Sequence, residues 1–181
     1  MTMLFDGTLF IPGGTNAPSL EAIALGLARR PRFAGQTSRP FNVLAHSFLV
    51  ADLIEDPTVK VHGLLHDAAE AIVGDIPSTW KTEADVDREV EIICRIYKSL
   101  GLELPTVEED GTVAFADHLA LQAEATLLMP DAIADCGTGE IPRLMNCDPA
   151  VKKAADWIAI GDRDYWQPIW CQRVMAAVQK L

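Results

Sequence analysis

Apolar residues recur at the three- and four-residue spacing of an α-helix along most of this chain of 181 residues. Runs with the composition and alternation of β-strands are almost absent. The pattern therefore predicts an all-α protein that forms one domain. The expected helices cover residues 18–30, 41–55, 56–74, 82–101, 113–129, 149–160 and 164–180.

Residues suited to helix ends stand at several of these boundaries. Ser19 is placed to cap the first helix. Asp56 and Pro57 are placed to begin the third helix, and Gly74 follows its end. Gly101 ends the fourth helix. That helix is amphipathic, and its expected apolar stripe consists of Val86, Val90, Ile93 and Ile96.

The segments outside these helices are rich in Gly, Pro and small polar residues, which are typical of turns and loops. Residues 1–16 predict a short hairpin or an extended arm, and residues 130–149 predict a long connection. Within the single domain, residues 1–181, we distinguish three parts. They are an N-terminal arm (1–16), a metal-binding helical core (17–128) and the C-terminal helices (129–181).

Composition excludes several classes of protein. Hydrophobic residues make up 49% of the chain and charged residues 23%, which is ordinary for a globular domain. The net charge of -11 argues against nonspecific binding of nucleic acid, which requires a basic surface. No apolar run approaches the ~20 residues of a membrane span, and a signal-peptide pattern is missing from the start. We therefore expect a cytoplasmic protein with neither a membrane nor a nucleic-acid partner. Free thiols are expected at Cys94, Cys136, Cys147 and Cys171.

Four residues of metal-ligating type lie on helical faces that are otherwise apolar. Taken singly, a histidine in such a place is usually a hydrogen-bonded core residue. The adjacent pair His66 and Asp67, however, lies about three turns into its predicted helix, too far from the start to act as a cap. Burying two such groups is costly without partners, and a divalent ion such as Zn, Mn, Co or Mg would supply one. The candidate ligands are His46, His66, Asp67 and Asp117.

Two further acidic residues follow this pair. Glu70 stands three residues after Asp67 and four after His66, so the three side chains share one side of the predicted helix. A carboxylate beside a bound metal can orient an attacking water, accept its proton or protonate a leaving group. Asp75 follows Gly74 and is either a second acid–base group or a turn residue.

The segment HDAAEAIVGDIPSTWK, residues 66–81, together with His46 and Asp117, resembles the His-Asp (HD) domain superfamily of metal-dependent phosphohydrolases. It is especially similar to the HD-domain 5'-deoxynucleotidases and related phage and bacterial phosphohydrolases, with the signature HD-x-x-E-x-x-x-G-D-[IL]-P-x-x-x-K. This chain has every element of that signature. Arg32 and Phe33 also precede His46 by about fourteen residues, as an Arg and an aromatic do in that group. The resemblance covers roughly residues 17–128 and implies a helical HD-domain bundle.

The resemblance also implies roles for single residues. Arg32 would pair with the substrate phosphate, because a guanidinium group offers a fork of donors. Phe33 would pack beside the sugar, where relatives that prefer deoxyribose often carry Trp. Arg39 would contact phosphate or be a solvated loop charge. Lys81 would contact phosphate or cap its loop. Trp80 would lie near the substrate. The metal ligands would be His46, His66, Asp67 and Asp117, and the catalytic residues Glu70 and Asp75.

Three functions are compatible with this pattern. The first is a metal-dependent 5'-nucleotidase that releases inorganic phosphate from deoxynucleoside monophosphates. The second is a dNTP triphosphohydrolase, for example a dATP-specific one, which releases tripolyphosphate and needs more cations; Arg29, Arg30, Arg32, Arg39 and Lys81 are available. The third is a nucleotide-binding HD module without catalysis, which the intact ligand set argues against.

Relatives form oligomers, so we expect a homo-oligomer, with the Trp-rich C-terminal segment as its interface.

Overall fold

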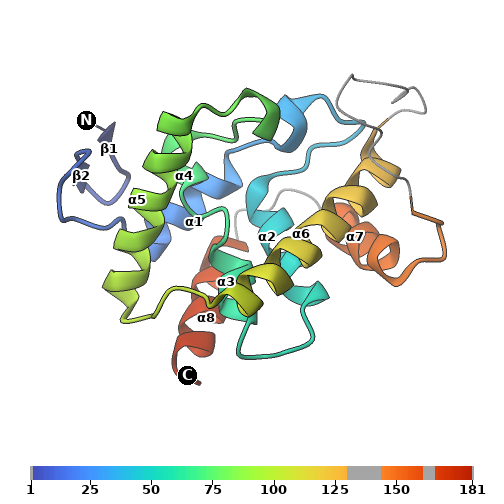
Figure 1. The fold of residues 1–181 in the computed structure, drawn as a ribbon. Coiled ribbons are helices and arrows are strands. Elements are labelled where there is room, and N and C mark those ends of the chain that lie inside the picture. Colours follow the sequence, from blue (N-terminus) through green and yellow to red (C-terminus); the bar gives the residue numbers. More distant parts are fainter. Residues whose placement is uncertain (1, 130–143, 161–165, 181) are drawn as a thin grey trace.

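Helix α2 (Val43–Leu53) lies in the middle of the protein, with other helices on all sides of it (Figure 1). The computed structural model describes residues 2–129, 144–160 and 166–180. Nearly all of α2 is buried, in keeping with an apolar sequence that has no polar face. It contacts α1 (Leu20–Ala28), α3 (Lys60–Leu65), α6 (Val107–Leu128), α7 (Pro149–Ile160) and α8 (Trp166–Val178).

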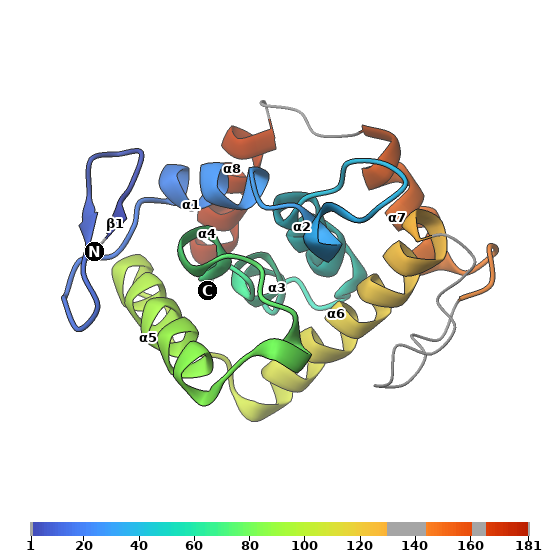
Figure 2. The same cartoon turned by 90° about the horizontal axis from the view of Figure 1, so that it is seen from above.

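The expectation of a mostly helical protein is confirmed, with one small exception at the N-terminus. Strands β1 (Thr2–Met3) and β2 (Leu9–Phe10) form an antiparallel hairpin beside α5 (Glu83–Leu100) (Figure 2). Arg95 of α5 holds the end of this arm, because its guanidinium donates to the carbonyl of Ile11 at 3.0 Å. The remaining short elements are η1 (Arg32–Gly35), α4 (Glu70–Val73) and η2 (Ser78–Trp80). No helix among these described residues is long and apolar enough to cross a membrane.

Several predicted helix ends are confirmed. The side chain of Ser19 accepts a hydrogen bond from the backbone N–H of Ala22 and so caps α1. Gly101 follows α5 in the left-handed conformation, with φ 67°, which glycine adopts at little cost. Helix α6 begins at Val107, six residues before the expected start at Val113. The reason is a capping box formed by Thr106 and Glu109.

The single helix predicted over residues 56–74 is wrong, because the chain forms two short helices there, α3 and α4. Between them the backbone bonds to the third residue back rather than the fourth, as in the 2.9 Å bond from Glu70 N–H to Asp67 C=O. Asp56 does not start a helix. Its carboxylate accepts from the backbone N–H and the hydroxyl of Thr58, which is the bonding of a local turn.

The predicted apolar stripe of α5 is only partly buried. Val86 and Val90 are 46% and 56% exposed, whereas the buried residues of this helix are Ile92, Ile96 and Tyr97. Helix α5 lies at the edge of the protein (Figure 2). The predicted stripe is thus offset from the buried side of α5, which runs through Ile92, Ile96 and Tyr97.

The C-terminal tryptophans belong to the core of the chain itself. The ring of Trp157 stacks on Phe48 of α2 with 4.7 Å between centroids. Trp170 is fully buried and its indole N–H donates to the hydroxyl of Ser47. These two rings therefore pack within the chain itself, and the expected homo-oligomer with the C-terminal segment as its interface stays a prediction. Free thiols are present at Cys94, Cys147 and Cys171, and Cys136 lies outside the described residues.

Helix α1 approaches α4 so closely that only glycine fits at position 26. A Cβ atom there would lie 2.7 Å from the Cβ of Ala71 and 2.8 Å from its carbonyl oxygen. We expect Gly26→Ala to lower the free energy of unfolding by about 1–3 kcal/mol, because the two backbones must move apart. Gly111 lies in α6 with open space around it. Gly111→Ala should therefore raise stability by about 0.5–1 kcal/mol.

Chemical denaturation of both variants measures the two changes. Unchanged stability of Gly26→Ala would show that α1 and α4 do not pack as described.

Candidate metal centre

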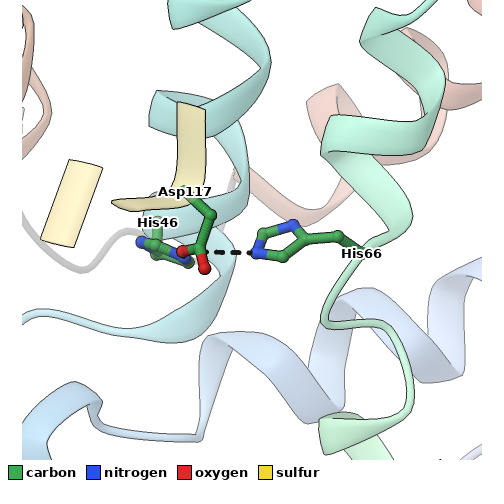
Figure 3. A group of neighbouring side chains, drawn as sticks. All are labelled: His46, His66 and Asp117. Atoms are coloured by element: carbon green, nitrogen blue, oxygen red, sulfur yellow. Dashed lines mark ion pairs between the residues drawn. The ribbon is translucent and has the colours of Figure 1, made fainter. Parts of the chain in front are cut away.

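Three side chains from three different helices converge beside α2 (Figure 3). His46 comes from α2, His66 follows the last residue of α3, and Asp117 comes from α6. One ligand atom from each lies within 4.8 Å of the others. The Oδ1 atom of Asp117 is 3.0 Å from Nε2 of His46 and 3.8 Å from Nε2 of His66. This group of side chains could hold a metal ion.

Asp67 lies at the same place. Its Oδ2 atom is 3.1 Å from Nε2 of His66 and 3.6 Å from Nε2 of His46. The fold therefore brings together all four residues that the sequence suggested as metal ligands. The break between α3 and α4 falls at this pair, so His66 and Asp67 belong to the turn that joins these short helices.

The tautomers of both histidines suit a metal. Nδ1 of His66 lies 2.9 Å from the carbonyl of Gly63, which can only accept, so the proton is on Nδ1. Nδ1 of His46 lies 2.5 Å from Oε1 of Glu124, which favours the same tautomer. Both Nε2 atoms are buried, and neither has a hydrogen-bond partner in the described part of the chain. Two imidazole nitrogens and two carboxylates form a donor set that fits Zn, Mn or Co.

Glu124 is the main site residue that the sequence did not reveal. It is fully buried in α6 and accepts from two groups, Nδ1 of His46 and Nε of Arg32, the latter at 3.3 Å. Its position could have been a clue, because it lies seven residues, or about two helical turns, after Asp117. That spacing puts Glu124 on the same face of the helix as Asp117. A carboxylate that is buried on this face needs a polar partner.

Arg32 is held next to the metal group by an irregular segment. Its backbone N–H donates to the carbonyl of Phe41 at 2.9 Å, which ties η1 to the start of α2. Phe33 and Ala34 both have positive φ, 52° and 51°, which is uncommon for residues other than glycine. The Phe33 ring lies 5.5 Å from the guanidinium carbon of Arg32, whose side chain is 12% exposed.

Neighbouring charges set the pKa values of His46, His66 and Asp67. Burial lowers the pKa of His46 and so does Arg32, but the carboxylates of Glu124 and Asp117 outweigh both and raise that pKa to about 10. Burial also opposes the charge of His66, yet neighbouring Asp67 leaves its pKa raised. Burial raises the pKa of Asp67 as well, but His66 and His46 hold it below the usual range. Without a metal, His46 is therefore protonated on both ring nitrogens at neutral pH, and the pKa of His66 is shifted in the same direction.

The pKa values of Glu70 and Asp75 are raised, whereas that of the candidate ligand Asp67 is lowered. Burial, together with the negative charges of Asp67 and Asp75, raises the pKa of Glu70 to about 9. Burial also raises the pKa of Asp75. One oxygen of Glu70, Oε2, is buried without a hydrogen-bond partner among the residues described. Lys81, which bonds Glu89 of α5 at 2.8 Å, is close enough to lower the pKa of both acids.

Two predicted substrate contacts are not joined to this group. Trp80 is 78% exposed, and Arg39 is exposed on the loop that precedes α2. Within the described ranges, neither side chain has a hydrogen bond, ion pair or ring contact with the metal group or with Arg32. The roles of Trp80 and Arg39 as substrate contacts therefore stay predictions.

Metal and protons should compete for this site. Because His46 and His66 hold protons below their raised pKa values, a bound ion must displace them. We expect the affinity for Mn²⁺ to rise with pH as long as His46, whose pKa is about 10, is protonated, with about one to two protons released per ion. Calorimetry in buffers of different ionisation enthalpy counts these protons. His118→Ala, at an exposed histidine of α6, should leave the profile unchanged, whereas a pH-independent affinity would contradict the assignment.

Glu124 should control the metal affinity without being a ligand. Glu124→Gln keeps the volume but weakens the bond to His46 Nδ1 and leaves the guanidinium of Arg32 without its carboxylate. We expect metal binding to weaken by about 10–100-fold, the usual effect of losing a partner of a ligating histidine. Glu108→Gln, an exposed change on the same helix, is the matched control. Equal metal affinity in both variants would remove Glu124 from this role.

Comparison with known proteins adds no family to this description. A search against models of protein families found no match, and a search of curated proteins found none that is significantly similar.

Proposed function

We propose that this chain is a divalent-metal-dependent phosphohydrolase of the HD-domain type that acts on nucleotides. More specifically, we propose a 5'-nucleotidase that releases inorganic phosphate from deoxynucleoside monophosphates. The observation that carries the proposal is the group of His46, His66, Asp67 and Asp117, in which both Nε2 atoms are buried and lack hydrogen-bond partners among the described residues. Glu124 joins His46 of this group to Arg32, whose side chain is 12% exposed.

The chemistry follows from the residues present. A divalent ion bound by the four ligands would neutralise phosphoryl oxygens and lower the pKa of water. Arg32 uses Nε for Glu124, and its terminal amino groups make no hydrogen bond to any described residue. Those two groups match the oxygens of a phosphate, as the fork of a guanidinium does elsewhere. Arg32 would thus orient the phosphate against the metal group.

Glu70 is suited to proton transfer to the leaving group. Its pKa is raised to about 9 in the metal-free protein, where it is protonated at neutral pH. The positive charge of a bound metal near Asp67 would shift Glu70 toward its ionised form, which can accept a proton from the attacking water and then give it to the 5' oxygen. Asp75 and Lys81 flank Glu70 and would adjust this balance.

The distribution of cations favours a monophosphate substrate over a triphosphate. Among the basic residues that the sequence offered, Arg32 and Lys81 influence the carboxylates of the site. Arg29 and Arg39 instead line a separate cavity. A triphosphate would need cations for two further phosphates. We therefore keep the dNTP triphosphohydrolase as the alternative function, and no observation favours the module without catalysis.

Product analysis tests this proposal directly. The purified chain, supplied with Mn²⁺, Co²⁺, Zn²⁺ or Mg²⁺, should release inorganic phosphate from dAMP. Release of tripolyphosphate from dATP, with dAMP left intact, would support the alternative. No hydrolysis of either nucleotide with any of these ions would contradict both.

The same assay separates metal binding from proton transfer. Glu70→Gln should retain the metal and lower kcat by about 100-fold or more, because it removes a titrating group. Asp67→Asn should lose both metal and activity. Glu55→Gln, an exposed change outside the site, controls for the loss of a carboxylate. Normal turnover by Glu70→Gln would remove Glu70 from the mechanism.

A further inference from the structure

A cavity of about 450 Å³ lies between the end of α1 and the loop that leads into α2. Its size falls in the range of about 300–1,000 Å³ that is usual for small-molecule sites. Arg29 and Arg39 line it together with the polar residue Ser38 and with apolar Pro31 and Phe41. The metal group and Arg32 do not contribute to its wall, so this cavity is distinct from the candidate metal centre.

The cavity lies in a stretch of the chain, residues 22–51, that has four arginines and no acidic residue. The sequence has a net charge of -11, yet no Asp or Glu occurs between Glu21 and Asp52. Among the residues that the structure describes, no Asp or Glu lines the cavity. The guanidinium groups of Arg29 and Arg39 form no ion pair or hydrogen bond with any residue that the structure describes. Two such cations without a counter-charge favour an anionic ligand.

The walls of this cavity are fixed by backbone hydrogen bonds. Pro31 and Asn42 form an isolated antiparallel bridge across the base of the loop. The N–H of Val43 donates to the carbonyl of Arg30 at 3.0 Å. The tip of the loop is held from α6, because the N–H of Ser38 donates to the carbonyl of Leu128 at 2.8 Å. A ligand would therefore lose little affinity to the ordering of the loop.

The lining identifies the class of ligand. Arginine presents donors in a planar fork that matches phosphate oxygens. The apolar wall, which includes Pro31 and the buried ring of Phe41, suits an organic body larger than a free phosphate. We infer that this cavity is a second site that binds a phosphate-bearing small molecule, such as a nucleotide, with Arg29 and Arg39 on the phosphate. The inference requires neither a metal nor hydrolysis, so it stands apart from the proposed function.

Binding is measured on the full chain after removal of metal with a chelator, with dAMP, deoxyadenosine and inorganic phosphate as probes. We expect saturable binding of dAMP, weaker binding of phosphate, and none of deoxyadenosine. Arg29→Gln and Arg39→Gln should each weaken dAMP binding by about tenfold or more, because each removes a hydrogen bond to a charged group. Arg30→Gln makes the same charge change beside the cavity without touching its lining and should bind as the parent does.

The place of binding is checked by NMR. The backbone amides of Thr37 and Ser38, which line the cavity, should shift during the dAMP titration with the same dissociation constant as in calorimetry. Shifts confined to His46, His66 and Asp117 would show that dAMP binds at the metal centre and would overturn the second site. Absence of saturation, or parental affinity in both Arg29→Gln and Arg39→Gln, would overturn it too.

Discussion

The burial of His46 among carboxylates is the interaction on which the rest of the structure depends. This imidazole sits on a helix that is apolar on nearly all sides, and it is fully buried. An isolated charge in such a place would be expensive, but Glu124 and Asp117 lie against its two nitrogens. Both partners come from α6, and the turn after α3 adds His66 and Asp67. The packing of α3 and α6 on α2 is thus also the assembly of the polar group.

A single buried carboxylate connects the two working parts of the candidate site. Glu124 accepts from Nδ1 of His46 on one oxygen and from Nε of Arg32 on the other. The position of the guanidinium is therefore linked to the orientation of an imidazole in the metal group. A phosphate on Arg32 would be placed relative to that group through contacts that exist before any substrate arrives. Such preorganisation is the usual means by which sites of this kind stabilise developing charge.

The sequence predicted those site residues that stand out from their immediate neighbours in the chain. The pair His66–Asp67 was conspicuous because two polar residues interrupt an apolar run, and Glu70 follows at helical spacing. Glu124 was missed because glutamate is a common surface residue, and only the packing of α6 shows that it is buried. The break after α3 was missed because Ala68, Ala69 and Ala71 favour continuous helix. Positive φ at Phe33 and Ala34 also has no local signal, since glycine is absent from both positions.

Overall charge and local charge act over different distances in this protein. Screening at physiological salt limits the influence of exposed charges to roughly 8 Å. Exposed carboxylates that lie farther than this from Arg29 and Arg39 therefore act little on these two side chains. The loop before α2 places Arg32 against Glu124 on one side, while Arg29 and Arg39 line a cavity on their own. An acidic overall charge is in this way compatible with the two phosphate sites that we propose, because its field acts mainly on large polyanions.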